Sequence, residues 1–207
     1  MISYTITVCN EEKEINSLLN FISKRMRDTD EIVVQMDSES VTSEVRSVVN
    51  RYKEWLNNLV VIEYPLNNNF ADFKNNLKKH CSKEWIFNID ADELPAGTLM
   101  EHIYTILEDN HDVEMLLVPR WNIVEDITEE HIIKWGWKID KKGRINWPDF
   151  QTRIYKNVEN IVWQNKVHER LSGFNSYSAL PDEDEYCLFH TKTIERQEKQ
   201  NDFYTKL

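Results

Sequence analysis

Cysteine is scarce in this 207-residue chain, which holds only Cys9, Cys81 and Cys187. Three thiols so far apart exclude a disulfide framework or a zinc cluster, and they predict a reducing compartment, the cytoplasm. Long apolar runs are lacking too: no stretch approaches a membrane span, and no signal peptide precedes the first predicted strand. We therefore expect a soluble protein.

Positive charge is also in short supply, with 25 Lys and Arg against 36 Asp and Glu and a net charge of −11. Such a chain is a poor partner for nucleic acid or for an anionic membrane surface. An anionic nucleotide would need local help, from a metal ion and a nearby lysine. Repeats, linkers and low-complexity stretches are missing as well, so we predict one domain over residues 1–207.

The first half of the chain alternates between strand and helix patterns. Strands are predicted over residues 2–8, 31–36, 59–63, 85–89 and 115–120. Apolar residues at helical spacing predict helices over residues 12–27, 43–56, 70–80 and 98–110, the last opened by a capping box from Thr98 to Glu101. This order predicts an α/β domain with a mostly parallel sheet that binds ligands beyond the carboxyl ends of its strands.

The chain changes character after Arg120. Five of the seven tryptophans follow it: Trp121, Trp135, Trp137, Trp147 and Trp163. Residues 140–144 are predicted to turn, residues 151–156 to form a strand, and residues 195–207 to form a charged helix. Because aromatic faces stack on sugar rings, we interpret residues 121–207 as an acceptor-facing half with a smaller antiparallel element. The alternative for each tryptophan is ordinary core packing.

The most informative segment is residues 85–93, an apolar strand that ends in Asp90, Asp92 and Glu93. Three carboxylates this close repel one another unless a cation such as Mg²⁺ or Mn²⁺, shared with a substrate phosphate, neutralises them. An ordinary acidic turn is the plain alternative. An EF-hand is excluded because Leu94 and Pro95 stand where that loop needs an oxygen ligand and a glycine. Leu94 also departs from the aspartyl-nucleophile phosphatase pattern.

The ordered set of motifs resembles the GT-A glycosyltransferases of family 2, especially compact bacterial lipopolysaccharide-core glucosyltransferases. The matching segments are ITVCNEE at 6–12, DEIVVQMDS at 30–38, FKN at 73–75, WIFNIDADE at 85–93, FQTRIY at 150–155, VHE at 167–169 and the late His190. The resemblance implies that residues 1–120 bind a nucleotide-sugar and that residues 121–207 face the acceptor. It implies transfer of a hexose from a UDP-sugar, UDP-glucose or UDP-galactose, to a hydroxyl of a saccharide or glycoconjugate.

The same resemblance assigns the donor site to residues near the strand ends. The nucleotide-binding residues that it implies are Thr7, Val8, Asn10, Glu11, Asp37, Lys74, Asp90 and Ala91. A carboxylate at Asp37 suits the N3–H of uracil, although the same residue could instead cap the next helix. Glu11 could instead complement a helix dipole, and Lys74 could lie on a solvated face.

Metal ligands are implied at Asp92 and His190, with His168 as the rival histidine. A carboxylate–imidazole set shifts the metal preference from Mg²⁺ toward Mn²⁺. Mn²⁺, or else Mg²⁺, is therefore the predicted cofactor.

Glu169 is the predicted general base, which takes the proton of the acceptor hydroxyl in an inverting transfer. Its alternative role is a solvated glutamate paired with Arg170. Glu93 and Asp149 are the next candidates for the base.

Two other classes of protein stay open at this point. One is a different metal-dependent phosphate enzyme, a nucleotidyltransferase or a phosphatase. The other is a non-catalytic carbohydrate-binding module. Metal-dependent release of UDP together with product formation distinguishes a glycosyltransferase from both. The sequence leaves the oligomeric state open.

Overall fold

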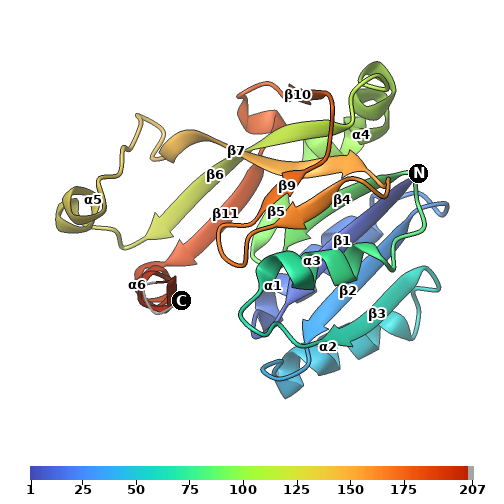
Figure 1. The fold of residues 1–207 in the computed structure, drawn as a ribbon. Coiled ribbons are helices and arrows are strands. Elements are labelled where there is room, and N and C mark those ends of the chain that lie inside the picture. The colour runs from blue at the N-terminus through green and yellow to red at the C-terminus, as the bar shows by residue number, and fades with distance from the viewer. Residues whose placement is uncertain (205–207) are drawn as a thin grey trace.

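Strands and helices alternate through the first half of the chain, as the sequence pattern predicts (Figure 1). The computed structural model describes residues 1–204. The strands are β1 (Ile2–Val8), β2 (Glu31–Asp37), β3 (Leu59–Tyr64), β4 (Trp85–Asp90), β5 (Glu93–Pro95), β6 (Met115–Glu125), β7 (Ile145–Lys156), β8 (Val162–Gln164), β9 (Arg170–Ser172), β10 (Tyr177–Ala179) and β11 (Leu188–Thr193). The helices are α1 (Glu12–Ser23), α2 (Ser43–Lys53), α3 (Phe70–Lys78), α4 (Gly97–Asp109), α5 (Glu129–Trp135), the short 3₁₀ helix η1 (Asp184–Tyr186) and α6 (Ile194–Tyr204).

In the described part of the chain, nine strands form one central sheet, in the order β3-β2-β1-β4-β7-β6-β11-β5 with β10 also beside β6. Neighbours pair in parallel except where β7 joins β4 and β6 and where β5 joins β11. Strands β8 and β9 form a separate antiparallel pair. This arrangement confirms the predicted α/β class, with a mostly parallel sheet and a smaller antiparallel element in the second half.

Strand β4 is buried on both faces of the sheet. Trp85, Phe87 and Ile89 enter the larger apolar cluster with residues of α1, α2 and α4, whereas Ile86 enters a smaller cluster with Ala71 of α3. Successive side chains of a strand point to opposite faces, so burial on both sides fixes the register of β4. It thereby fixes the place of the carboxylates that follow.

The predicted helix starts and ends need correction. Helices α1, α2 and α3 end at residues 23, 53 and 78, before the predicted residues 27, 56 and 80. The capping box at Thr98 is wrong: α4 begins at Gly97, and Ala96 is its N-cap without a side-chain hydrogen bond. The N–H of Ala96 donates to the carbonyl of Cys187, so pairing with a distant segment sets where the helix begins.

The second half departs more from the prediction. Strand β6 runs on past residue 120, β7 begins before residue 151, and α5 was not predicted between them. In Figure 1, α5 lies at the far end of these two long strands. The turn at residues 140–144 is confirmed, since Asp140 accepts from the backbone N–H groups of Lys142 and Arg144. The terminal helix begins at Ile194, and the predicted residues 205–207 lie outside the described residues.

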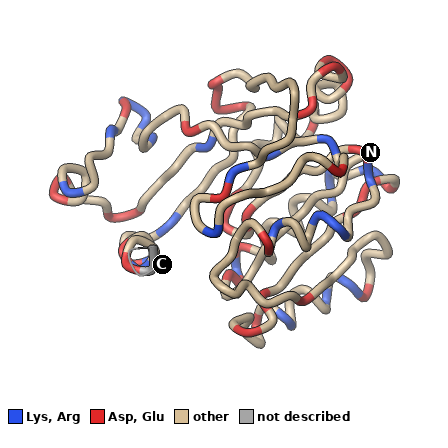
Figure 2. The backbone as a smooth tube through the Cα atoms, in the orientation of Figure 1, with Lys and Arg blue, Asp and Glu red and all other residues tan. Residues whose placement is uncertain are grey.

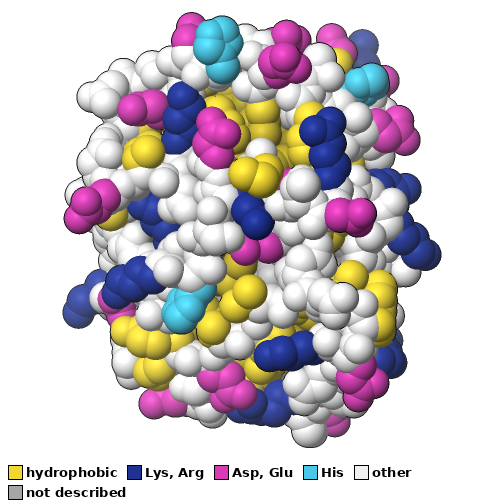
Figure 3. Space-filling view, turned by 90° about the vertical axis from the view of Figure 1, so that its right-hand side faces the viewer, with side chains coloured by type: hydrophobic (Ala, Val, Ile, Leu, Met, Phe, Trp, Pro, Cys, Tyr) yellow, Lys and Arg dark blue, Asp and Glu magenta, His cyan; other side chains and the backbone are white. Residues whose placement is uncertain are grey.

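Charged residues are distributed over the whole trace rather than gathered in one lobe (Figure 2). On the face shown in Figure 3, acidic and basic side chains are interspersed among uncharged ones. The net charge of −11 is therefore spread over the molecule. The attraction of a charged ligand then depends on the side chains that line the protein's cavities. Among the described residues, none of the helices has the length and apolar character to span a bilayer.

Candidate active site

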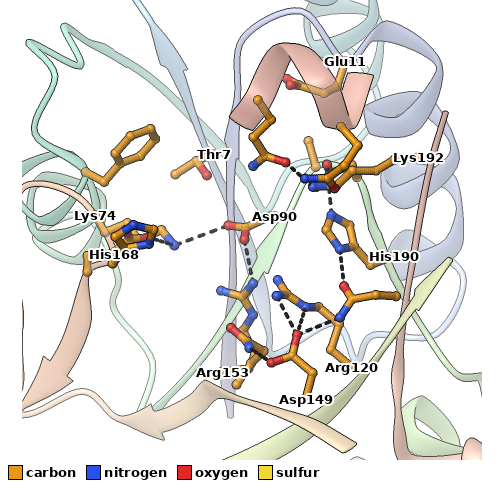
Figure 4. Close-up of a pocket in the computed structure, with 18 of the residues that line it drawn as sticks. Thr7, Glu11, Lys74, Asp90, Arg120, Asp149, Arg153, His168, His190 and Lys192 are labelled. Carbon is orange, nitrogen blue, oxygen red and sulfur yellow. Dashed lines mark hydrogen bonds and ion pairs between the residues drawn. The ribbon is translucent and has the colours of Figure 1, made fainter. Parts of the chain in front are cut away.

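A cavity of about 590 Å³ opens at the carboxyl ends of β1, β2 and β4. Side chains from both halves of the chain converge on it (Figure 4). Its lining includes every predicted site residue except Asn10: Thr7, Val8, Glu11, Asp37, Lys74, Asp90, Ala91, Asp92, His168, Glu169 and His190. Asn10 is exposed, and its backbone N–H donates to the Glu11 carboxylate. The strand order thus gathers distant residues at the sheet edge where a ligand site is expected.

Asp37 reaches the cavity from the end of β2. Its Oδ1 accepts hydrogen bonds from the backbone N–H groups of Glu39 at 3.3 Å and Leu66 at 3.1 Å. The alternative that Asp37 caps the next helix is wrong, because Thr42 is the N-cap of α2 and its hydroxyl accepts from Val45. Loop amides therefore hold this carboxylate at the cavity wall.

Glu11 is engaged by the protein itself. Its Oε2 accepts from the backbone N–H groups of Cys9 and Asn10, and its Oε1 pairs with Arg196 at 3.0 Å. Arg196 belongs to α6, and it also contacts Glu14 at 3.0 Å. The carboxylate therefore shapes the loop after β1 and ties the C-terminal helix to the cavity wall.

Lys74 is buried, so the alternative of a solvated surface lysine is wrong. Its Nζ lies 2.7 Å from Glu169 Oε1 and 3.4 Å from Asp90 Oδ1, and 4.7 Å from the ring centroid of Trp163. Glu169 thus pairs with Lys74, and in the described part of the chain it makes no ion pair with Arg170. One lysine joins the predicted base to the acidic motif after β4.

Two arginines of the antiparallel strands neutralise the rest of the acidic motif. Arg153 contacts Asp90 at 2.6 Å and Glu93 at 2.5 Å, and Arg120 contacts Glu93 at 3.2 Å. Burial raises the pKa of Asp90, but the charges of Arg153 and Lys74 outweigh it and hold the pKa well below its usual range. Asp90 is therefore ionised and already paired.

Asp92 faces a different set of partners. Its Oδ2 lies 3.2 Å from His190 Nε2 and 3.4 Å from Arg196 Nη2. Burial raises the pKa of Asp92, but the hydrogen bond and the charge of His190 outweigh it and bring the pKa to about 2. The carboxylate is thus ionised at neutral pH.

A polar relay fixes the orientation of the His190 ring. The Asn122 Nδ2 group donates to Asp149 at 2.8 Å, so the Asn122 amide oxygen must be the atom that faces His190 Nδ1, also at 2.8 Å. An amide oxygen only accepts hydrogen bonds, so Nδ1 carries a hydrogen and Nε2 faces the Asp92 carboxylate. A proton or a metal ion must lie between Nε2 and the carboxylate, because both are otherwise acceptors.

This pair of residues suits a divalent metal only in part. Among the described residues, no group of three His, Cys, Asp or Glu side chains lies close enough to hold a metal ion. The two neighbouring carboxylates are engaged elsewhere: Asp90 is turned toward Arg153 and Lys74, and Glu93 toward Arg153 and Arg120. Asp92 and His190 would hold an ion that takes its remaining ligands from water and from the phosphates of a substrate, as Mg²⁺ and Mn²⁺ often do.

The other two base candidates, Glu93 and Asp149, both pair with arginines. Glu93 is 1% exposed and lies beneath Arg120 and Arg153. Burial raises the pKa of Asp149, but its polar contacts, chiefly the charge of Arg120, outweigh burial and hold the pKa below its usual range. Glu93 is enclosed, whereas Asp149 and Glu169 both reach the cavity, with side chains 27% and 17% exposed.

Sequence reasoning missed several polar residues of the cavity, among them Arg120, Asn122, Arg153 and Lys192. The alternation of side chains along a strand could have predicted one of them. Lys192 is two residues from His190 and therefore lies on the same face of β11. For the arginines, only the pairing of β7 with β4 and β6 shows that they meet the acidic motif.

Residues 3–179 match the model of Glycosyl transferase family 2. The chain therefore belongs to this family, which confirms the family and the enzyme class that the motifs predict. Among proteins of curated function, none matches the sequence significantly. The closer resemblance to lipopolysaccharide-core glucosyltransferases stays a prediction.

Solved structures share the fold. Residues 1–349 of TarS from S. aureus are 19% identical at a TM-score of 0.65, and the match covers 92% of this chain and 60% of that one. The same TarS fragment in complex with UDP-GlcNAc gives 19% identity and a TM-score of 0.66, covering 92% of this chain and 58% of that one. Identity this low shows the fold alone, which confirms the GT-A prediction. This chain is similar to about three-fifths of the TarS fragment's length.

Proposed function

We propose that this protein is a metal-dependent, inverting hexosyltransferase that uses a UDP-sugar, UDP-glucose or UDP-galactose, and transfers the hexose to a hydroxyl of a saccharide or glycoconjugate. The observation that carries the proposal is that one cavity joins a buried carboxylate at Asp37, the Asp92–His190 pair and the Glu169 carboxylate. The TarS structures in complex with UDP and with UDP-GlcNAc support a uridine donor.

The donor would lie along the strand ends. Asp37 would accept from the uracil N3–H, with Thr7, Val8, Asn10, Glu11, Lys74, Asp90 and Ala91 around the nucleoside. Asp92 and His190 would hold Mn²⁺, or Mg²⁺, with His168 as the rival histidine. The metal supplies positive charge to the diphosphate as it leaves.

Glu169 would act as the base. Its partner Lys74 lies 2.7 Å away and would hold the carboxylate in place at the cavity wall. A base within hydrogen-bond reach of that hydroxyl removes its proton as the new bond to the anomeric carbon forms. Attack from the face opposite the diphosphate inverts the anomeric configuration.

The second half of the chain would face the acceptor. Trp137, Ile145 and Asn146 line the cavity from the segment between β6 and β7 and from the start of β7. The ring of Trp137 packs against Trp135 and is half-buried, and its exposed part would contact a sugar. By contrast, Trp163 is buried against Tyr155, which supports core packing for this tryptophan.

The decisive test is a turnover assay with a panel of UDP-sugars that includes UDP-GlcNAc, with Mn²⁺ and with excess EDTA. We expect UDP release and a glycosylated product with Mn²⁺ only, and NMR of the anomeric proton should show inversion. Asp92→Ala should abolish metal-dependent UDP binding, and Asp37→Ala should weaken UDP binding while leaving metal binding intact. Release of pyrophosphate, or sugar binding without turnover, would refute the proposal.

A further inference from the structure

Lys192 differs from the other cations of the site. Its side chain is buried, with 8% of the residue exposed, and it lines the cavity. Its Nζ donates to the amide oxygen of Gln200, a neutral group on α6. Within residues 1–204, no carboxylate oxygen lies within 4 Å of this ammonium group.

The other cations at the cavity wall all have carboxylate partners. Ion pairs shorter than 3.1 Å join Lys74 to Glu169, Arg120 to Asp149 and Arg153 to Asp90. A buried charge without a counter-ion destabilises a protein. Among the described residues, the carboxylates near Lys192 are already engaged, so an anion that binds in the cavity is the candidate for its counter-ion.

The place of Lys192 on β11 indicates which anion. Side chains two residues apart on a strand point the same way and stand about 7 Å apart. His190 and Lys192 are such a pair, and both are buried on the cavity side of β11 (Figure 4). His190 contacts Asp92, so a ligand bound at Asp92 and His190 lies beside the Lys192 ammonium group.

We propose that Lys192 is a further catalytic residue, which donates a hydrogen bond to the β-phosphate of the nucleotide donor. This inference rests on the proposed function. When the bond between the anomeric carbon and the β-phosphate oxygen breaks, the electron pair stays on that oxygen. The fixed charge of Lys192 stabilises it, while the acceptor oxygen bonds to the anomeric carbon and Glu169 takes the acceptor proton. Lys192 stays protonated throughout.

The test compares nucleotides with and without a β-phosphate. Calorimetry with Mn²⁺ present would measure the binding of UDP and UMP to the wild-type protein and to Lys192→Met. A hydrogen bond to a charged group predicts a loss of UDP affinity of about 10- to 100-fold, with UMP affinity within about twofold of wild type. Lys192→Arg should recover part of the UDP affinity.

Lys199→Met is the matched control. Lys199 is exposed on α6, so this variant loses the same charge outside the cavity and should bind UDP as the wild type does. The free Lys192→Met protein should unfold at the wild-type temperature or above, because the variant removes a buried charge that lacks a carboxylate partner. Lys192→Gln, which keeps a polar head group, serves as a second variant.

Inorganic pyrophosphate, titrated in parallel, separates this inference from the proposed function. If pyrophosphate binding depends on Lys192 while UDP binds weakly to the wild type, the uridine donor is wrong and the anion site stands. If UDP binds equally to wild type and Lys192→Met, or if UMP and UDP affinities fall together, the role of Lys192 is refuted. If the wild type binds neither anion, both are refuted.

Discussion

Replacing Asn122 with alanine tests the relay that orients His190. Asn122 links Asp149 to His190 through two contacts of 2.8 Å, and it fixes Nδ1 as the protonated ring nitrogen. Without it the ring can rotate, or change tautomer and turn a protonated Nε2 toward Asp92. We expect Asn122→Ala to lower Mn²⁺ affinity even though Asn122 itself would not touch the ion.

The magnitude follows from the role of such orienting contacts. Removing a hydrogen-bond partner of a metal-bound histidine typically costs about 10- to 100-fold in metal affinity, or about 1.4–2.8 kcal/mol. Mn²⁺ binding in the presence of UDP would be measured by calorimetry or by electron paramagnetic resonance. UMP binding, measured without metal, would show that the rest of the cavity is intact.

Gln151→Ala is the matched control for this variant. Gln151 also donates to Asp149, at 2.7 Å, but within the described residues it makes no hydrogen bond to His190. The control should therefore keep the wild-type Mn²⁺ affinity. An unchanged affinity in Asn122→Ala, or an equal loss in both variants, would refute the reasoning.

Three further predictions concern the histidines, the base and acid stability. His190→Ala should lower Mn²⁺ affinity by about 10- to 100-fold, more than His168→Ala does, and calorimetry that shows the reverse order would make His168 the ligand. Glu169→Gln should lower turnover by about 10²- to 10⁴-fold, the usual share of a general base, with UDP-sugar binding nearly intact; near-normal kcat would exclude Glu169. Burial raises the pKa of Glu31, but hydrogen bonds from Ser3 and Ser82 outweigh it and lower the pKa below its ordinary value. A depressed folded pKa stabilises the protein above the unfolded pKa of about 4.3, and this stability is lost as the pH falls through the folded value. Urea denaturation should thus show Glu31→Gln less stable than wild type at pH 7, with the difference shrinking toward pH 3, and a constant difference would contradict the assignment.

The strand half of the donor site could be predicted from sequence because local patterns determine it. Strand β4 is apolar from Trp85 to Phe87 and again at Ile89, and its last residue and the turn after it supply Asp90 and Asp92. The end of β2 places Asp37 at the same edge of the sheet, because β1 pairs in parallel with both β2 and β4. Such pairings follow from the alternation of strand and helix, so the approximate place of these carboxylates needs no tertiary information.

The cations and the second-half elements could not be predicted in the same way. Helix α5 begins with a capping box between Thr128 and His131, and a histidine at that position is no familiar start signal. Arg153 and Arg120 face the acidic motif only because β7 runs antiparallel between β4 and β6. Arg196 reaches Asp92 across almost the whole sequence, and no periodicity encodes that contact.

The predicted division into a donor half and an acceptor half stays a proposal. The contacts between the two halves indicate that both contribute residues to the donor site. Strand β11 pairs with β5, so that His190 stands opposite Glu93 within the acidic motif itself. Asn122, Asp149 and His190 all come from the second half, yet their relay ends on Asp92 of the first. A protein cut after residue 120 would keep Asp37 and Asp92 but lose the imidazole, its orienting amide and the arginine that neutralises Asp90. Because like charges repel, the carboxylates of the motif need these second-half partners to hold their places before any donor arrives.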